Sequence, residues 1–147
     1  MKGLKLWHII VVALFLSLSV GGCALTQLDS KANDEAGLRE RVEEFMQAKT
    51  TSNWIKAFDY FDSGFRAKTN RENFAASPKT MIFQAFSIEK IEIDPAGDQA
   101  KVHLVQDFVM MGYEFKQKPE VQNWIKEKGK WFLKMTTAED NFRQPQK

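Results

Sequence analysis

The stretch over residues 81–93, MIFQAFSIEKIEI, decides the fold because its apolar residues follow a period of two. This alternation is typical of a β-strand with one buried face. The apolar residues keep one parity up to Ile88 and take the other parity from Ile91 onward. The change of parity predicts a β-bulge near Glu89 and Lys90.

More strands are expected after this stretch. The segment 94–98, DPAGD, has the Pro and Gly of a turn, and residues 100–108 again alternate apolar with polar side chains. A second turn is expected at 116–120, KQKPE, followed by a strand over 121–126 and a last strand over 131–135. The pattern therefore predicts an antiparallel meander of about four strands.

Upstream of residue 81 the apolar period is that of a helix. A first helix is expected over 34–49, and a second helix over 52–64 with Gly64 as its left-handed C-terminal cap. The segment 69–72, TNRE, matches a capping box and predicts a short third helix that carries Phe74. Helices grouped before strands predict an α+β fold, with the N-terminal helices on one face of the antiparallel sheet. The expected buried side chains of these helices are Leu38, Val42, Phe45, Met46, Trp54, Ile55, Phe58 and Phe61.

Composition excludes several classes of protein. The chain has 147 residues, with 21 Lys and Arg against 19 Asp and Glu and a single Cys. This length fits one domain, and a net charge of +2 is too small to indicate nucleic-acid binding. One Cys excludes an intramolecular disulfide framework and a Cys-rich metal site. We expect no metal site and no cofactor.

The first 22 residues have the order of a bacterial secretory signal. Lys2 and Lys5 are followed by the apolar segment 6–20 and then by Gly21 and Gly22. The sequence VGGC that ends at residue 23 resembles the lipobox of bacterial lipoproteins. That resemblance implies cleavage before Cys23 and a diacylglycerol on its thiol.

An uncleaved transmembrane anchor is the alternative for this segment. The apolar part, residues 6–20, is shorter than the ~20 residues that a spanning helix needs. The lipoprotein interpretation therefore takes precedence, with residues 23–33 as the lipidated Cys and a tether. Ala24 after the Cys favours the outer membrane, facing the periplasm, over the inner membrane. Residues 137–147 are polar and are expected to form a flexible tail.

Several segments of residues 34–136 resemble the nuclear-transport-factor-2-like superfamily, also called SnoaL-like or the cystatin-like cone. They are the first helix, SNWIKAFDYF at 52–61, IEKIEI at 88–93 with DQAKV at 98–102, and WIKEKGKWFL at 124–133. The resemblance implies a curved, cone-like sheet wrapped around a long N-terminal helix. Enzymes of that superfamily place Asp, His or Tyr inside the cone.

No set of catalytic residues emerges from the sequence. His103 is the one His after the signal segment, and its strand neighbours place it on the outward face. Asp107 on that face lies four residues away, roughly 13 Å at ~3.3 Å per residue, which is too far for a direct pair. Asp59 and Asp62 are expected to be exposed near a helix end. The candidates for lining a pocket in the cone are Tyr60, Gln106 and Tyr113.

The sequence thus predicts a membrane-anchored envelope lipoprotein with a non-catalytic domain. Its expected partners are membrane lipid through acylated Cys23, and a small apolar ligand or an envelope protein, with no nucleic acid. A homodimer and the display of a free sheet edge to a partner stay open. The alternative is a small cofactor-free isomerase, dehydratase or hydrolase that uses the cone pocket.

Overall fold

The computed structural model describes residues 23–77 and 79–135. The predicted signal segment 1–22 and the predicted tail 137–147 lie outside this range. Residues 1–33 and 34–147 separate into two units, and the fold belongs to the second unit. In the part of the chain that is described, no helix is both long and apolar enough to cross a membrane.

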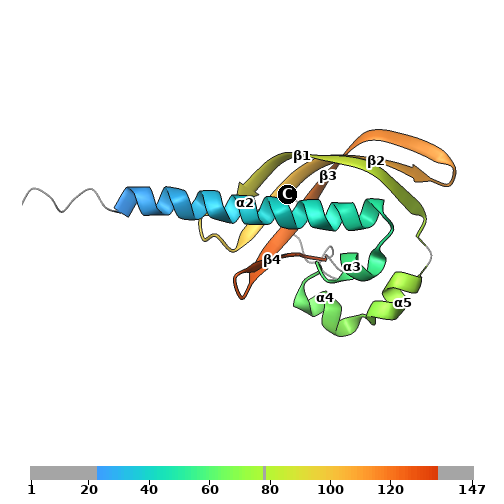
Figure 1. Cartoon of the computed structure of the whole chain (residues 1–147), viewed down its shortest axis with the longest axis horizontal. Coiled ribbons are helices and arrows are strands. Elements are labelled where there is room, and N and C mark those ends of the chain that lie inside the picture. The colour runs from blue at the N-terminus through green and yellow to red at the C-terminus, as the bar shows by residue number, and fades with distance from the viewer. Residues whose placement is uncertain (1–22, 78, 136–147) are drawn as a thin grey trace, which may run out of the picture. The chain divides into compact units, whose positions relative to one another are not determined.

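The second unit has an α+β fold, as predicted, in which helices precede a four-stranded antiparallel sheet of order β1-β2-β3-β4 (Figure 1). The helices are α2 (Cys23–Thr50), α3 (Trp54–Phe58), α4 (Ser63–Lys68) and α5 (Arg71–Ala76). The strands are β1 (Met81–Ile93), β2 (Gln99–Met110), β3 (Tyr113–Glu127) and β4 (Lys130–Leu133).

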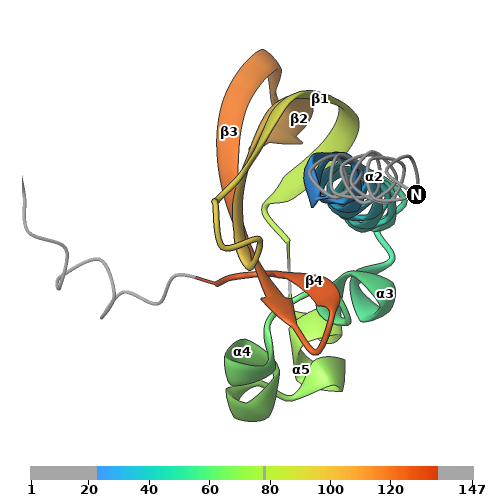
Figure 2. The same cartoon turned by 90° about the vertical axis from the view of Figure 1, so that its left-hand side faces the viewer.

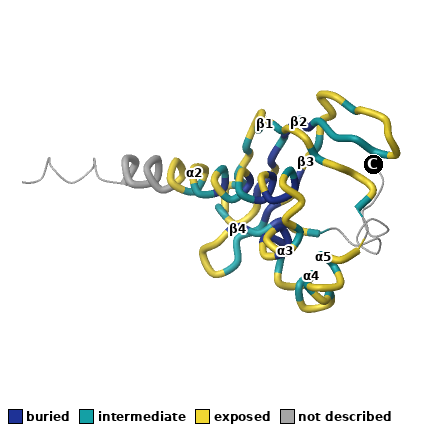
Figure 3. The backbone as a smooth tube through the Cα atoms, turned by 45° about the vertical axis from the view of Figure 1, so that its right-hand side comes forward, coloured by how far each residue is buried: buried dark blue, intermediate teal, exposed yellow. Residues whose placement is uncertain are grey.

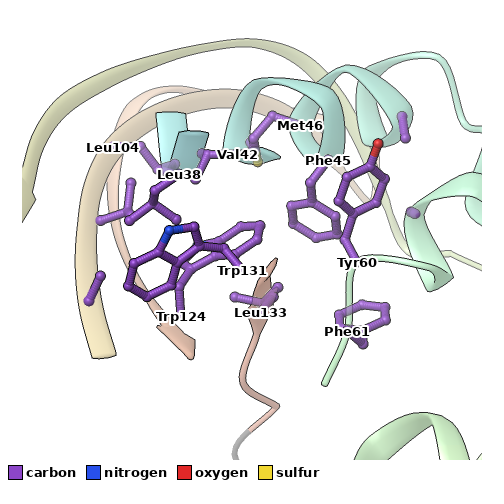
Figure 4. Close-up of a cluster of buried hydrophobic side chains, with 14 of the residues drawn as sticks. Leu38, Val42, Phe45, Met46, Tyr60, Phe61, Leu104, Trp124, Trp131 and Leu133 are labelled. Carbon is purple, nitrogen blue, oxygen red and sulfur yellow. The ribbon is translucent and has the colours of Figure 1, made fainter. Parts of the chain in front are cut away.

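From Asp34 onward, α2 lies along one face of the curved sheet, which we call the inner face (Figure 2). The apolar stripe predicted for this helix is buried, with Leu38, Val42 and Met46 each 0% exposed. Figure 4 shows these side chains against residues of the sheet, among them Leu104 and Trp124. Their burial stabilises the helix on the sheet because isolated short helices are marginal in water.

The helices differ from prediction in two places. Helix α2 begins at Cys23, so the expected start at residue 34 is wrong. The expected second helix is broken into α3 and α4, and Gly64 lies inside α4 instead of capping a helix. Asp62 causes the restart, because its Oδ1 accepts the Phe65 N–H at 3.0 Å as an N-cap. Ile55, expected in the core, is 39% exposed.

The β1–β2 register confirms the predicted bulge, because it shifts between Ile88 and Lys90. The turn predicted at 116–120 is wrong, since β3 runs through that segment. There Gln117 has a φ of 52° and its N–H donates to Asp107 Oδ1 at 2.7 Å. This long-range bond lets a Pro-containing segment remain in the ladder as a bulge.

Candidate functional site

Polar side chains follow one another along the inner face of β2 and β3, where an apolar core would be expected. Gln106 is 8% exposed and Gln122 is 3% exposed. Glu120 lies next to Gln122 on the same face of β3, since residues two apart in a strand share a face. These residues, of which the two glutamines are buried and Glu120 is half-buried, form a line across the sheet that we call the polar line.

Hydrogen bonds connect the whole line. The Glu120 carboxylate accepts one bond from Gln106 Nε2 and another from Gln122 Nε2, the latter at 2.9 Å. Gln122 Oε1 in turn accepts from Trp124 Nε1 at 3.1 Å. Gln106 Oε1 is left buried without a hydrogen-bond partner among the described residues. A buried acceptor without a donor is costly, so this atom marks a place where a donor fits.

Lys49, in the last turn of α2, is the cation of this region. It is 8% exposed, and its Nζ lies 3.8 Å from the centroid of the Phe83 ring. Burial lowers the pKa of Lys49, and the negative charge of Glu120 opposes that shift in part. The ammonium is therefore held in a poorly solvated place close to the polar line.

Beyond the last turn of α2, the inner face of the sheet carries two rows of large apolar side chains. Phe83, Phe108 and Phe115 are register partners, and the Phe108 and Phe115 rings stack at 5.0 Å. The next row consists of Met81, Met110 and Tyr113, also in register. We call these six residues the inner platform. They are half-buried or exposed, with Met81 38% and Tyr113 72% exposed, as the colours along this end of the sheet show (Figure 3).

The polar line and the inner platform together offer binding chemistry. At one end lie a buried ammonium and an unsatisfied amide oxygen, and at the other end lies apolar surface. A molecule with a polar head and an apolar body matches this arrangement. The Glu120 carboxylate is the one acid of the polar line, and its two amide donors hold it in place.

The three predicted pocket residues do not come together. Gln106 belongs to the polar line. Tyr113 is on the inner platform but pairs with Met110, roughly 13 Å along β2 from Gln106 at ~3.3 Å per residue. Tyr60 is 4% exposed and packs on Phe45. Figure 4 shows its hydroxyl pointing away from the two tryptophans of the core.

Tyr60 instead belongs to a separate small network. Its hydroxyl donates to Glu44 Oε2 at 2.9 Å, and the Arg41 guanidinium lies 4.3 Å from the centroid of its ring. Burial, followed by the bond to Glu44, raises the pKa of Tyr60 to about 12. The phenol is thus held protonated, as a structural donor.

His103 has an acidic neighbour that the sequence analysis missed. Its Nε2 lies 3.6 Å from Glu92 Oε1, across the β1–β2 ladder. The bulge in β1 sets this juxtaposition, and spacing along one strand does not reveal it. Glu92 also lines a groove of about 520 Å³ with Lys101 and Lys134, which lie at the sheet end away from the inner platform.

A second groove of about 630 Å³ lies between α2 and the unpaired edge of β1. Arg39, Glu43 and Gln47 form its helix wall, and Phe86 and Ile88 form its strand wall. This groove lies beside the β1 edge of the sheet. The display of a sheet edge to a partner is one of the alternatives that the sequence analysis did not decide.

Sequence reasoning also missed Lys49 and Glu120. Lys49 follows Phe45 by four residues and Met46 by three, so its place in the apolar stripe was a usable signal. Glu120 alternates with Gln122 and Trp124, but the false turn at 116–120 hid that pattern.

Across the described ranges, no group of three His, Cys, Asp or Glu side chains is placed to hold a metal ion. Cys23 is the first described residue and begins α2.

Comparison with known proteins does not indicate a function for this chain. No protein-family model matches the sequence, and no curated protein matches it. Among solved structures, the chain is similar to a SEC-C motif containing protein from Rhodopseudomonas palustris. The TM-score is 0.49 at 14% identity, over 60% of this chain and 68% of that chain. This likeness is too distant to transfer a function.

Proposed function

We propose that the chain is a lipid-anchored lipoprotein of the bacterial cell envelope, and that its α+β domain binds a ligand or a protein partner without catalysing a reaction. The anchor rests on the order of the first 23 residues: two lysines, an apolar segment and VGGC. The domain is proposed to be nuclear-transport-factor-2-like, on the sequence segments that resemble that superfamily.

One observation carries the binding role: a buried ammonium and an unsatisfied amide oxygen lie at the head of an open apolar surface. Lys49 and Gln106 are each 8% exposed, whereas Tyr113 at the far end is 72% exposed. Polar groups held this way cost stability unless a partner satisfies them. A fold that retains them beside exposed apolar side chains is suited to a partner that covers both.

Acyl chains on Cys23 would supply the membrane attachment. Each buried methylene contributes ~0.8 kcal/mol, so one chain binds marginally and two or three bind stably. Ala24 after the Cys favours the outer membrane, facing the periplasm, over the inner membrane under the sorting preference of enterobacterial lipoproteins. Under this proposal the net charge contributes little, and lipid does the anchoring.

Labelling of the full chain with radioactive palmitate in a bacterial host tests the anchor. The expected result is a labelled, membrane-bound protein that loses both label and sedimentation with membranes when Cys23→Ser is introduced. Ser30→Ala is the matched control, because it changes a nearby small residue and should leave labelling unchanged. A wild-type chain that takes up no label would refute the anchor.

A cofactor-free enzyme is the second candidate, and Glu120 is the observation that favours it. Its carboxylate lies in the polar line near the Lys49 ammonium, at the open end of the inner face. Turnover of an isomerase, dehydratase or hydrolase substrate by the purified chain would support the enzyme over the binding domain. If Glu120→Gln abolished that turnover and Glu43→Gln did not, the enzyme would replace the binding role.

A further inference from the structure

Lys49 is a buried residue whose Nζ has no anionic or carbonyl partner among the residues that the structure describes. The side chain is 8% exposed, and its Nζ makes no hydrogen bond or ion pair with any residue in the described ranges. Its close neighbours are aromatic, with Phe83 at 3.8 Å and Phe45 at 5.4 Å from ring centroid to Nζ. Aromatic faces attract an ammonium but cannot accept its hydrogen bonds as an oxygen does.

The charges around this point add up to a positive site. Lys118 is the register partner of Gln106, and its Nζ lies 6.0 Å from the centroid of the Phe115 ring, on the inner platform. Lys49 and Lys118 together outweigh the single negative charge of Glu120. Lys116 adds nothing to this sum, because Asp107 and Glu114 each lie 3.8 Å from its Nζ. The head of the inner platform therefore has a net charge of +1, counting Lys49, Lys118 and Glu120.

The hydrogen bonds of Glu120 go to two neutral amide groups and not to Lys49. One carboxylate oxygen accepts from Gln106 and the other from Gln122. Glu120 is thus held on the sheet by neutral amide donors, and no ion pair to Lys49 forms among the described residues. An incoming anion would therefore meet an ammonium that no residue of the described ranges pairs with.

The apolar surface continues from this head in one direction. Phe83, Phe108 and Phe115 come first, and Met81, Met110 and Tyr113 follow. From Gln106 to Met110 the distance is roughly 13 Å at ~3.3 Å per residue, which accommodates an alkyl chain of medium length. Methionine side chains adapt well to such chains because they are flexible and polarisable.

We propose that the inner platform binds a carboxylate on an apolar chain, with the carboxylate at Lys49 and the chain along the two rows. The Lys49 ammonium donates a charge-assisted hydrogen bond to the carboxylate, and Lys118 adds a second positive charge. Gln106 Oε1 accepts from a water molecule that accompanies the head group. This inference deepens the binding role proposed above, because it names the ligand class for the same surface.

Titration of the full chain in lipid nanodiscs with octanoate tests this assignment, with empty nanodiscs correcting for partition into lipid. The chain carries ¹³C-methyl methionine, so each methionine reports on its own surroundings. The expected result is a saturable shift of the Met81 and Met110 methyl signals, with Met135 unmoved. Octan-1-ol should bind at least about fivefold more weakly than octanoate, and octylamine should cause no saturable shift.

Lys49→Met keeps the length and packing of the side chain and removes its charge. It should weaken octanoate binding about tenfold or more, since a charge-assisted hydrogen bond is lost. Lys56→Met is the matched control, because it changes an exposed lysine of α3, and it should leave the affinity unchanged. Circular dichroism on both variants checks that they fold.

Three results would overturn the assignment: octan-1-ol binding as tightly as octanoate, Lys49→Met binding as tightly as the parent chain, or shifts that spread to Met135. A partner protein or a second copy of the chain on this surface would appear as the same Met81 and Met110 shifts in the absence of octanoate, dependent on added protein. That outcome would keep the binding role and reject the carboxylate. A wild-type chain that takes up no palmitate would reject the anchor alone, so the two proposals fail separately.

Discussion

The Tyr60 hydroxyl donates a hydrogen bond to Glu44 Oε2 at 2.9 Å and so joins the segment after α3 to the side of α2. The ring of Tyr60 is 4% exposed and packs on Phe45 in the core. The phenol therefore has an apolar body inside the fold and a polar tip on a surface carboxylate, which is the usual arrangement for a core tyrosine.

Tyr60→Phe should lower the free energy of unfolding by about 1 kcal/mol, because it removes one hydrogen bond and leaves the ring packing intact. The pKa of Tyr60 is raised from 10.0 to about 12 in the folded state, first by burial and then by the bond to Glu44. The folded chain therefore holds this proton more tightly than the unfolded chain does. The stability of the parent chain should fall as the pH rises from 10 to 12.

Absorbance at 295 nm measures the titration directly. The step near pH 12 should disappear in Tyr60→Phe and persist in Tyr113→Phe. In Glu44→Gln it should move to lower pH, because one cause of the raised pKa is removed. A step near pH 12 that survives in Tyr60→Phe would contradict the assignment.

Lys49→Met should stabilise the fold at pH 7 by about 1 kcal/mol, because a buried charge is replaced by an apolar side chain of similar length. Burial lowers the pKa of Lys49 below its ordinary value of 10.5, and Glu120 opposes this in part. The unfolded chain then binds the proton more tightly, so the stability of the parent chain should rise with pH up to about that value. Urea unfolding at pH 7 and pH 10 measures both effects.

The rise in stability with pH should be smaller in Lys49→Met than in the parent chain. Lys56→Met, which changes an exposed lysine of α3, should show the same rise in stability with pH as the parent chain. A destabilising effect of Lys49→Met would contradict this prediction. It would indicate that the Lys49 ammonium is paired with an acceptor in solution.

Glu120→Ala should destabilise the fold by about 2 to 3 kcal/mol, because it leaves Gln106 Nε2 without its acceptor and leaves Gln122 Nε2 with only the weak acceptor Met46 Sδ at 3.5 Å. Glu120→Gln keeps one acceptor oxygen and should cost less. Glu114→Ala, at an exposed position of the same strand, should change stability by less than about 0.5 kcal/mol. Equal losses in Glu120→Ala and Glu114→Ala would show that the polar line does not form.

Asp62→Ala should destabilise the fold by about 1 to 2 kcal/mol, because the carboxylate caps α4 and also accepts the Met135 N–H at 2.9 Å. Asp59→Ala is the matched comparison three residues earlier. Asp59 makes an exposed ion pair with Arg71, in which 53% of the Asp59 side chain and 39% of the Arg71 side chain are exposed. Such a pair contributes at most about 1 kcal/mol, so Asp59→Ala should cost less than Asp62→Ala in thermal unfolding.

Local patterns in the sequence predicted what local physics controls. The change of parity after Ile88 predicted the bulge, and the segment 69–72 predicted a short helix close to where α5 begins. The capping box itself is one residue out of register, because Asn70 is the N-cap and its Oδ1 accepts the Asn73 N–H at 2.8 Å, whereas Thr69 ends α4. The false turn at 116–120 shows the limit of that approach. Pro119 and a run of polar residues indicate a turn locally, but the side chain of Asp107 on the neighbouring strand holds the segment in the sheet.

The candidate site was predicted in part. Gln106 was identified from its place near an apolar face, whereas Tyr60 belongs to a different network and Tyr113 lies at the far end of the inner platform. The sequence did not predict that Lys49 is buried, because a lysine in the last turn of a helix is usually explained by its favourable interaction with the helix dipole. Its burial depends on strands that begin more than thirty residues later, as the element bounds show.

The sequence by itself determined the class of the fold, the order of helices and strands, and the lipobox-like segment that ends at Cys23. These features follow from periodicity, capping and side-chain size, which act over a few residues. Only the tertiary structure decided which polar groups are buried, that Gln106 and Glu120 meet, and that Lys49 lies over Phe83 with no ion-pair partner among the described residues. Burial and charge pairing depend on contacts between distant segments, because the register of the strands and the placement of α2 set them.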